Sequence, residues 1–364
     1  MRKLTIACLL ASFALPAALL GCGEGGGEQP PRSFFGVDPQ EPPSEEDARY
    51  MRAGGIDSVR WPLPWSGSQP EAGGEYSWAS FDPVVEAAAK QQLRVLPFIY
   101  STPAWLGEST ELPVENERQR RSWRRFLVAA VERYGPNGSF WREHESGAEK
   151  LPKTPIREWQ IWNEANFFYF AKPVAPQHYA RLVQESHRAL SEADPGAKLI
   201  LSGLFADPKQ EPPKAMDATR FLQGVYETEG ISEDFDGIAL HPYARDTSRL
   251  EELVTEFRAV PEENGDAGVP LYITEMGWGS QSESEVSFEK GPEGQAEELS
   301  DAYEYLASNR KALGLQAVYW FSWQDKRGSC NFCDSTGLFA EGEPLQPKLA
   351  WQDFVEASGG EAEP

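Results

Sequence analysis

The alternation of two kinds of segment constrains the fold of this chain more than any other feature. Short runs rich in β-branched and aromatic residues alternate with longer helical patterns from about residue 33 onward. Such alternation is typical of βα units whose strands form a parallel sheet. Eight such strands, each followed by a helix, predict a single-domain (β/α)8 TIM barrel over residues 33–358. The strands are expected at 33–37, 56–61, 93–100, 158–163, 198–204, 235–241, 271–275 and 316–321.

The helical segments show the periodicity that this fold needs. The clearest spans 116–134, where apolar residues recur every three or four positions until Gly135 ends the pattern. Similar spacing precedes Pro195 and Gly314, and a last helix is expected from about Leu349. A doubly wound open sheet is the alternative, but it would usually carry a Gly-rich phosphate loop after its first strand. Residues 34–39 read Phe-Phe-Gly-Val-Asp-Pro and form no such loop.

The charge of the chain restricts its partners. The 34 Lys and Arg against 57 Asp and Glu give a net charge of −23. A field of this sign repels phosphate backbones and anionic membrane surfaces, so nucleic acid is excluded as a main partner.

The amino terminus has the layout of an export signal. Arg2 and Lys3 precede an apolar run at 4–20, which we interpret as a cleaved signal peptide over residues 1–21. Residues 19–22, Leu-Leu-Gly-Cys, resemble the bacterial lipobox, which implies that Cys22 becomes the lipid-modified first residue. A flexible tether at 22–32 would then link the barrel to the outer face of a membrane, and residues 359–364 would form a disordered tail. An ordinary signal peptide with a chance cysteine is the alternative.

Cys330 and Cys333 form a C-x-x-C pair near the carboxyl terminus. In an exported chain with no second pair of ligands a zinc site lacks partners, so the pattern favours a short structural disulfide. We expect no metal and no cofactor.

Two glutamates mark the place where chemistry is expected. Residues 159–166 end the fourth strand as Trp-Gln-Ile-Trp-Asn-Glu-Ala-Asn, and residues 272–279 end the seventh as Tyr-Ile-Thr-Glu-Met-Gly-Trp-Gly. An ionised carboxylate at a barrel mouth must be paired or solvated, and barrel enzymes place their chemistry at the carboxyl ends of strands. Glu164 and Glu275 are therefore predicted to face each other, although either taken alone is more simply a surface residue.

These motifs resemble clan A of the glycoside hydrolases, with families 5 and 39 most similar. The resemblance extends over nearly the whole chain, and its further segments are Val59-Arg60-Trp61-Pro62, residues 93–97 and 101–105, His241-Pro242-Tyr243 and Tyr319-Trp320. It implies that Glu164 is the general acid/base and Glu275 the nucleophile of a retaining β-glycosidase. Such a mechanism uses one carboxylate to attack the anomeric carbon and one carboxylic acid to protonate the leaving oxygen.

The same resemblance implies roles for supporting residues, which it assigns to substrate binding: Arg60, Asn163, His241, Tyr243, Trp105, Trp278 and Trp320. Arg60 and Tyr243 would hold Glu275 ionised, Asn163 would reach the sugar 2-hydroxyl, and Trp320 would form the floor beneath the sugar. Simpler interpretations remain open: an Arg reaching solvent, a core histidine, or tryptophans that only pack. Trp323 is an alternative to Trp320, and Trp65 is a further candidate for a flanking subsite.

Two departures from the family pattern concern loops: Ala165 stands where a proline is more frequent, and the Cys330–Cys333 insert has no family counterpart. The expected partner is a β-linked oligo- or polysaccharide whose identity stays open, and we expect a monomer that contacts the membrane only through its lipid. Two other functions remain: a non-catalytic carbohydrate-binding lipoprotein on the same barrel, and a transglycosylase.

Overall fold

The computed structural model describes residues 29–146, 150–282, 284, 286–328, 330 and 333–364. The signal peptide, the lipobox with Cys22 and most of the tether fall outside these residues. No helix in the described ranges is both long and apolar enough to cross a bilayer.

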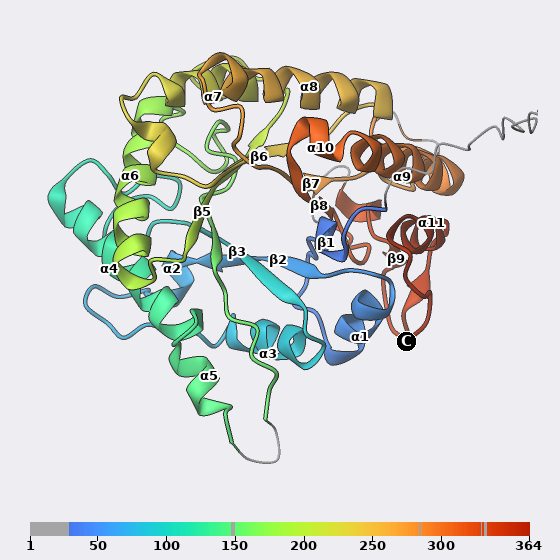
Figure 1. Ribbon diagram of the computed structural model, residues 1–364, viewed down its shortest axis with the longest axis horizontal. Coiled ribbons are helices and arrows are strands. Elements are labelled where there is room, and N and C mark those ends of the chain that lie inside the picture. Colours follow the sequence, from blue (N-terminus) through green and yellow to red (C-terminus); the bar gives the residue numbers. More distant parts are fainter. Residues whose placement is uncertain (1–28, 147–149, 283, 285, 329, 331–332) are drawn as a thin grey trace, which may run out of the picture.

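The strands form a closed parallel barrel in the order β1 to β8, with β1 pairing to both β2 and β8. This confirms the fold and each of the eight expected strands. Figure 1 shows the strands at the centre and the helices around them. The strands are β1 (Phe35–Val37), β2 (Ser58–Pro64), β3 (Arg94–Tyr100), β4 (Glu158–Ile161), β5 (Lys198–Phe205), β6 (Gly237–His241), β7 (Leu271–Met276) and β8 (Leu315–Trp320).

A helix follows each strand and covers the outside of the barrel. The principal helices are α1 (Glu45–Ala53), α3 (Asp82–Lys90), α4 (Glu117–Tyr134), α6 (Pro176–Ala193), α7 (Ala218–Tyr226), α8 (Thr247–Glu263), α9 (Gly291–Ser308) and α11 (Leu349–Ser358). Shorter helices are α2 (Trp65–Ser68), α5 (Ser139–Glu143) and α10 (Arg310–Leu313), and a two-stranded sheet joins β9 (Phe339–Ala340) to β10 (Gln346–Pro347).

The expected helix at 116–134 is confirmed, with its ends where the sequence places them. The Asn116 side chain accepts a hydrogen bond from the Gln119 N–H and the Gln119 side chain accepts one from the Asn116 N–H, which forms a capping box. At the other end, the Gly135 N–H donates to the carbonyl of Val131.

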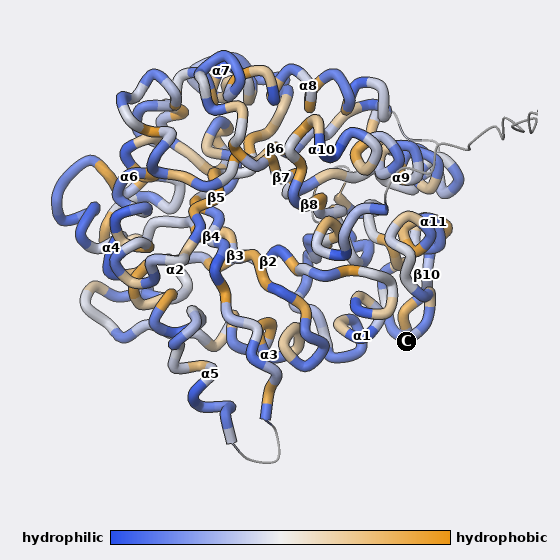
Figure 2. Tube along the Cα trace, viewed as in Figure 1, coloured by the Kyte–Doolittle hydropathy of each residue, from blue (hydrophilic) through white to orange (hydrophobic). Residues whose placement is uncertain are grey.

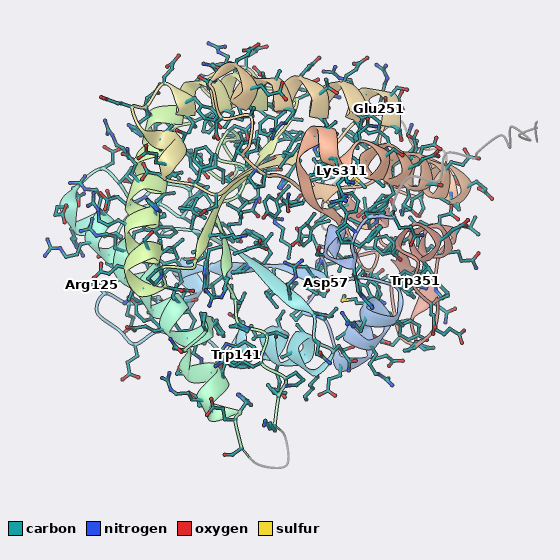
Figure 3. All side chains as sticks on the ribbon, in the orientation of Figure 1. Asp57, Arg125, Trp141, Glu251, Lys311 and Trp351 are labelled. Carbon is teal, nitrogen blue, oxygen red and sulfur yellow. A yellow bond between two sulfur atoms is a disulfide. The ribbon has the colours of Figure 1, made fainter. Side chains whose placement is uncertain are left out.

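Apolar side chains fill the barrel on both sides of its strands. A large cluster lies between strands and helices, and a smaller one fills the barrel interior with Leu96, Ile200, Ala239, Tyr272, Ala317 and Tyr319. Hydrophobic colour is prominent along the strands, while much of the helical outer surface is hydrophilic (Figure 2). Side chains occupy the space enclosed by the strands (Figure 3), so the barrel is a packed core that supports the residues at its mouth.

The tail at 359–364 differs from the expectation of disorder. The Glu361 N–H donates to the carbonyl of Ala53 at 2.8 Å, and the Trp351 indole donates to the carbonyl of Ala362 at 3.1 Å. These bonds tie the tail to α1 and α11, because its polar backbone finds partners there.

Candidate active site

The polar side chains singled out from the sequence meet at the carboxyl ends of the strands. Arg60 lies on β2, Glu275 on β7 and His241 at the end of β6, while Glu164 follows β4 and Tyr243 follows β6. Arg60, His241 and Tyr243 are buried, as is Glu164 at 8% exposure. Parallel strands that close into a barrel bring all their carboxyl ends to one rim, which is why residues far apart in sequence converge.

The backbone that delivers Glu164 adopts an uncommon conformation. Trp162 and Glu164 have φ angles of +73° and +38°, in the left-handed region that non-glycine residues seldom adopt. Each such residue costs about 1–3 kcal/mol and persists only where its surroundings hold it. Here the Trp162 N–H donates to Ile99 O at 2.8 Å and the Glu164 N–H to Gly203 O at 3.1 Å. The neighbouring strands therefore determine where the Glu164 carboxyl lies.

Arg60 is the centre of the charged network. Its Nη1 donates to Asp38 and, at 2.7 Å, to Glu275 Oε1, while its Nη2 donates to Asn163 Oδ1 at 2.6 Å. Glu275 also accepts from the Tyr243 hydroxyl, at 2.8 Å to Oε2. The guanidinium therefore pairs with two carboxyl groups and does not reach solvent.

A hydrogen-bond relay extends from Arg60 to Glu164 and determines which nitrogen of His241 carries the proton. Arg60 Nε donates to Gln160 Oε1 at 2.7 Å, which leaves Gln160 Nε2 to donate to Thr274 Oγ1 at 3.1 Å. The Thr274 hydroxyl then has its own proton to donate, and its second neighbour is His241 Nε2 at 2.9 Å. We therefore assign the lone pair to Nε2 and the proton to Nδ1.

The proton on His241 Nδ1 lies between the two candidate catalytic carboxyl groups. Nδ1 lies 3.0 Å from Glu164 Oε1, to which it donates, and 3.5 Å from Glu275 Oε1. Gly203 makes this position possible, because a Cβ there would come within 1.9 Å of His241 Nε2 and 2.5 Å of Thr274 Oγ1. The relay therefore supplies a hydrogen bond to the carboxylate form of Glu164.

Burial and nearby charges shift the pKa values of several side chains in this site. Burial, together with the charge of Glu275, raises the pKa of Glu164 well above its usual range. Burial raises the pKa of Asp38 to about 8, against the opposing charge of Arg60. Burial and the charge of Arg60 lower the pKa of His241, so the imidazole is neutral. The arrangement provides a protonated carboxyl at Glu164 beside Glu275, which is paired with Arg60.

The two glutamates lie close together. One carboxylate oxygen of each and one nitrogen of His241 all lie within 4.8 Å of one another. Among the described residues, this is the group of three potential metal ligands that lie this close together. The surroundings of the group nevertheless disfavour a cation. Arg60 contributes a positive charge beside Glu275, and His241 Nδ1 presents a proton in place of a lone pair.

The tryptophans expected to contact a sugar mostly lie elsewhere. Trp320 and Trp278 are 0% and 1% exposed, pack against each other at 6.2 Å and donate to the carbonyls of Thr336 and Ala244. Both rings are buried outside the barrel, where they support the site and present no face to a sugar. The remaining three candidates are placed as follows: Trp323 and Trp65 are buried in the core, and Trp105 is partly buried with its indole donating to the Gln69 carbonyl.

Phe321, which the sequence analysis did not consider, directly follows β8 and contacts Tyr243. It is partly exposed, and its ring is perpendicular to that of Tyr243, with the ring centroids 6.3 Å apart. Side chains alternate along a strand, and Ala317 and Tyr319 belong to the interior cluster, so Phe321 continues that face while Trp320 points to the helices. The alternation of side chains could have indicated this orientation. Because both faces of β8 are apolar, however, hydropathy does not show which face points inward.

Asp38, Gln160 and Thr274 were also missed as site residues. Asp38 directly follows β1 and is buried against Arg60, and Gln160 and Thr274 carry the relay to His241. Their positions at or near the carboxyl ends of strands were the available signal. Nothing in the sequence indicated which of them Arg60 would contact.

The Cys330–Cys333 disulfide is present in the structure, in the loop after β8. The carbonyl of Cys333 accepts from Gln40 Nε2 at 2.9 Å and from Thr336 Oγ1 at 3.0 Å. Since Thr336 also accepts from the indole of Trp320, this loop is connected to the end of β8.

The sequence matches no protein-family model and no curated protein, but solved structures resemble its fold. One is a family 39 glycoside hydrolase from Bacteroides cellulosilyticus WH2, with a TM-score of 0.64, 20% identity and coverage of 91% of this chain and 64% of that chain. A monomeric beta-xylosidase from Caulobacter crescentus CB15 gives 0.60 at 17% identity, covering 90% and 69%. A GH5_18 protein from Bifidobacterium longum subsp. infantis gives 0.63 at 15% identity, covering 90% and 78%. This chain thus spans somewhat less than two thirds of the first neighbour, and the similarity establishes the barrel fold.

Proposed function

We propose that this protein is a retaining β-glycosidase of the clan A type, in which Glu275 is the nucleophile and Glu164 the general acid/base. The observation that carries the proposal is the pairing of two carboxyl groups whose environments differ. Glu164 is buried with a raised pKa, whereas Glu275 accepts hydrogen bonds from Arg60 and Tyr243. One group is thus prepared to give a proton and the other to attack, which is what the two steps require.

The separation of the two carboxyl groups supports retention of configuration. Retaining enzymes hold the two groups about 5–5.5 Å apart, and inverting enzymes hold them about 6.5–9.5 Å apart to admit a water. Oxygens of Glu164 and Glu275 lie within 4.8 Å of each other, which is closer than the separation typical of an inverting pair.

In the first step, Glu275 attacks the anomeric carbon while Glu164 gives its proton to the leaving oxygen. Loss of that proton creates a carboxylate at Glu164, and His241 Nδ1–H at 3.0 Å stabilises it. In the second step this carboxylate takes a proton from water, which displaces the sugar from Glu275. The Tyr243 hydroxyl stays protonated as a donor, because burial and the charge of Glu275 raise its pKa.

The neighbours in the fold comparison include proteins described as a beta-xylosidase, a glucosidase and an exo-beta-1,4-mannosidase. These names motivate a β-linked oligo- or polysaccharide as the substrate class. We further propose that the protein is an exported monomer tethered through lipid on Cys22, from the signal-like amino terminus.

The test compares Glu275→Gln, Glu164→Ala and the exposed Glu229→Gln as a matched control. Hydrolysis is measured on a panel of β-linked oligosaccharides and on 2,4-dinitrophenyl β-glycosides, whose leaving group needs no proton. We expect Glu275→Gln to abolish turnover on every substrate. Glu164→Ala should abolish oligosaccharide hydrolysis yet still form the glycosyl-enzyme from the activated aryl glycoside, and added azide should trap that intermediate as a β-glycosyl azide.

Two outcomes would contradict the assigned roles, and two others would indicate a different function. Equal loss on both substrates in Glu164→Ala would remove its role as the acid, and an α-configured first product would replace retention by inversion. Oligosaccharide binding without turnover in the unaltered protein would indicate a carbohydrate-binding protein. Longer oligosaccharides among the products would indicate transglycosylation.

A further inference from the structure

Four consecutive aromatic residues, Phe167-Phe168-Tyr169-Phe170, follow the acid/base Glu164 in the loop between β4 and α6. Tyr169 is 66% exposed, the most exposed large hydrophobic side chain in the described part of the chain. Its ring stacks on that of Phe168, with the ring centroids 4.4 Å apart and an interplanar angle of 28°. An ordered ring pair at the surface is unlike the singly scattered apolar residues that a soluble protein tolerates without a function.

The loop holds these rings in place through contacts with two other segments. The Phe167 N–H donates to Glu164 O at 2.8 Å, which closes a turn directly on the acid/base residue. The Phe168 N–H donates to Lys214 O at 2.8 Å, and Phe167 forms an antiparallel bridge with Ala215. The rings are therefore attached to the segment that follows β5 as well as to β4.

A row of aromatic contacts connects this surface pair to the catalytic carboxyl groups. Phe167 contacts Phe168 at 5.1 Å and Phe205 at 5.5 Å, and Phe205 contacts Tyr243 at 6.3 Å. The Tyr243 hydroxyl donates to Glu275 at 2.8 Å. The exposed rings are thus continuous with the site.

The barrel order shows which half of a substrate would meet these rings. In a closed ring of eight strands β4 lies opposite β8, so the loop after β4 lies across the barrel mouth from Phe321, which follows β8. The general acid must stand on the side of the leaving oxygen, and the aromatic loop continues from that acid. The side chain of Lys214, 5.9 Å from the ring of Phe168, adds a cationic hydrogen-bond donor.

We propose that Phe168 and Tyr169 form a binding platform for a sugar residue of the leaving group of a β-linked oligosaccharide. This inference rests on the proposed function, because Glu164 marks the leaving-group side only if it is the acid. The faces of a β-linked pyranoside carry axial C–H bonds, which pack on the flat face of an aromatic ring. The platform gives the protein a preference for substrates with at least one sugar beyond the bond that is cleaved.

The test uses Phe168→Ala and Tyr169→Ala, with Leu349→Ala as the control. Leu349 is 45% exposed and lies at the start of α11, so its loss removes an exposed apolar side chain elsewhere on the surface. Each protein is assayed on cello-, xylo- and mannotetraose and on the β-glycosyl fluoride of the sugar that is cleaved. Fluoride carries no ring to stack, so it reports the other half of the site alone.

We expect kcat/KM on the cleaved tetrasaccharide to fall about tenfold in each platform variant, which is about 1.4 kcal/mol. Turnover of the glycosyl fluoride should be unchanged, and Leu349→Ala should match the unaltered protein. Tyr169→Trp keeps an aromatic ring and should retain activity on the tetrasaccharide. Calorimetric binding of the three tetrasaccharides is measured in parallel, so that the platform is tested even without turnover.

Each remaining outcome decides the question. Tetrasaccharide binding that weakens in the variants while the unaltered protein shows no turnover keeps the platform and removes the glycosidase. Equal losses on fluoride and tetrasaccharide, or unchanged tetrasaccharide kinetics, overturn the platform and leave the glycosidase. Absence of binding to all three tetrasaccharides overturns the platform, as does a dimer in sedimentation that Tyr169→Ala dissociates, since a second copy would then be the occupant.

Discussion

Thr274 tests the hydrogen-bond relay because its hydroxyl alone assigns the tautomer of His241. Thr274→Val keeps the shape of the side chain and removes the donor to His241 Nε2, 2.9 Å away, and the acceptor of Gln160 Nε2. The proton of the neutral imidazole is then free to move to Nε2. His241 Nδ1 would accept a hydrogen bond from protonated Glu164 where it previously donated to the carboxylate.

The sign and size of the effect follow from this exchange. The charged form of Glu164 loses a donor and the neutral form gains an acceptor, so its pKa rises further. One hydrogen bond contributes about 0.5–1.5 kcal/mol net, and a pKa unit corresponds to about 1.4 kcal/mol. The alkaline limb of kcat/KM should therefore move upward by up to about one pH unit, because Glu164 stays protonated to higher pH.

The assay is the pH dependence of kcat/KM on an oligosaccharide, whose leaving group needs the proton of Glu164. Thr274→Ser is the matched control: it loses a buried methyl group at about 1 kcal/mol of unfolding free energy but keeps the hydroxyl. Thr274→Val should lower the free energy of unfolding by about 1–3 kcal/mol, since it leaves a buried nitrogen without a hydrogen-bond partner. An alkaline limb that shifts equally in both variants, or in neither, would refute the relay.

Three further results are expected. Burial raises the pKa of Asp38 to about 8, so its protonated form is favoured on folding; this contribution is present below about pH 4 and is lost as the pH rises through about 8. The melting temperature of Asp38→Asn, relative to that of the unaltered protein, should therefore increase as the pH rises from 4 to 8. A relative decrease over that range would argue against burial as the cause of the pKa shift. Gly203→Ala should displace His241, reduce kcat more than a hundredfold and destabilise the fold by about 1–3 kcal/mol, whereas Gly268→Ala, with open space around its Cβ, should do neither. Replacing both cysteines of the Cys330–Cys333 disulfide with serine should raise KM more than it lowers the melting temperature, because so small a ring constrains little of the unfolded chain; unchanged kinetics would separate this loop from the site.

The strand and helix pattern was readable from the sequence because it depends on local periodicity. Parallel barrel strands are short apolar runs, and helices such as α4 carry their own caps, so both can be recognised without knowledge of their neighbours. The positions of Glu164 and Glu275 at strand ends followed from the same pattern, because closure of the barrel brings all such ends to one rim.

The orientation of side chains on β8 could not be read in the same way. A strand buried on both faces has no alternation of polar and apolar residues, so hydropathy does not reveal which residues point inward. Packing therefore decided the orientations: Trp320 contacts Trp278 outside the barrel, and Phe321 contacts Tyr243.

What the sequence alone determined is the barrel and the candidate pair of carboxyl groups, since both arise from short-range patterns and strand order. The tertiary structure alone decided that Asp38 shares Arg60 with Glu275, that the tail binds α1 and α11, and that a threonine directs the proton of His241. These features depend on distances of about 3 Å between residues that are up to several hundred positions apart. Such distances are set by the packing of the whole barrel, and no local pattern of residues contains them.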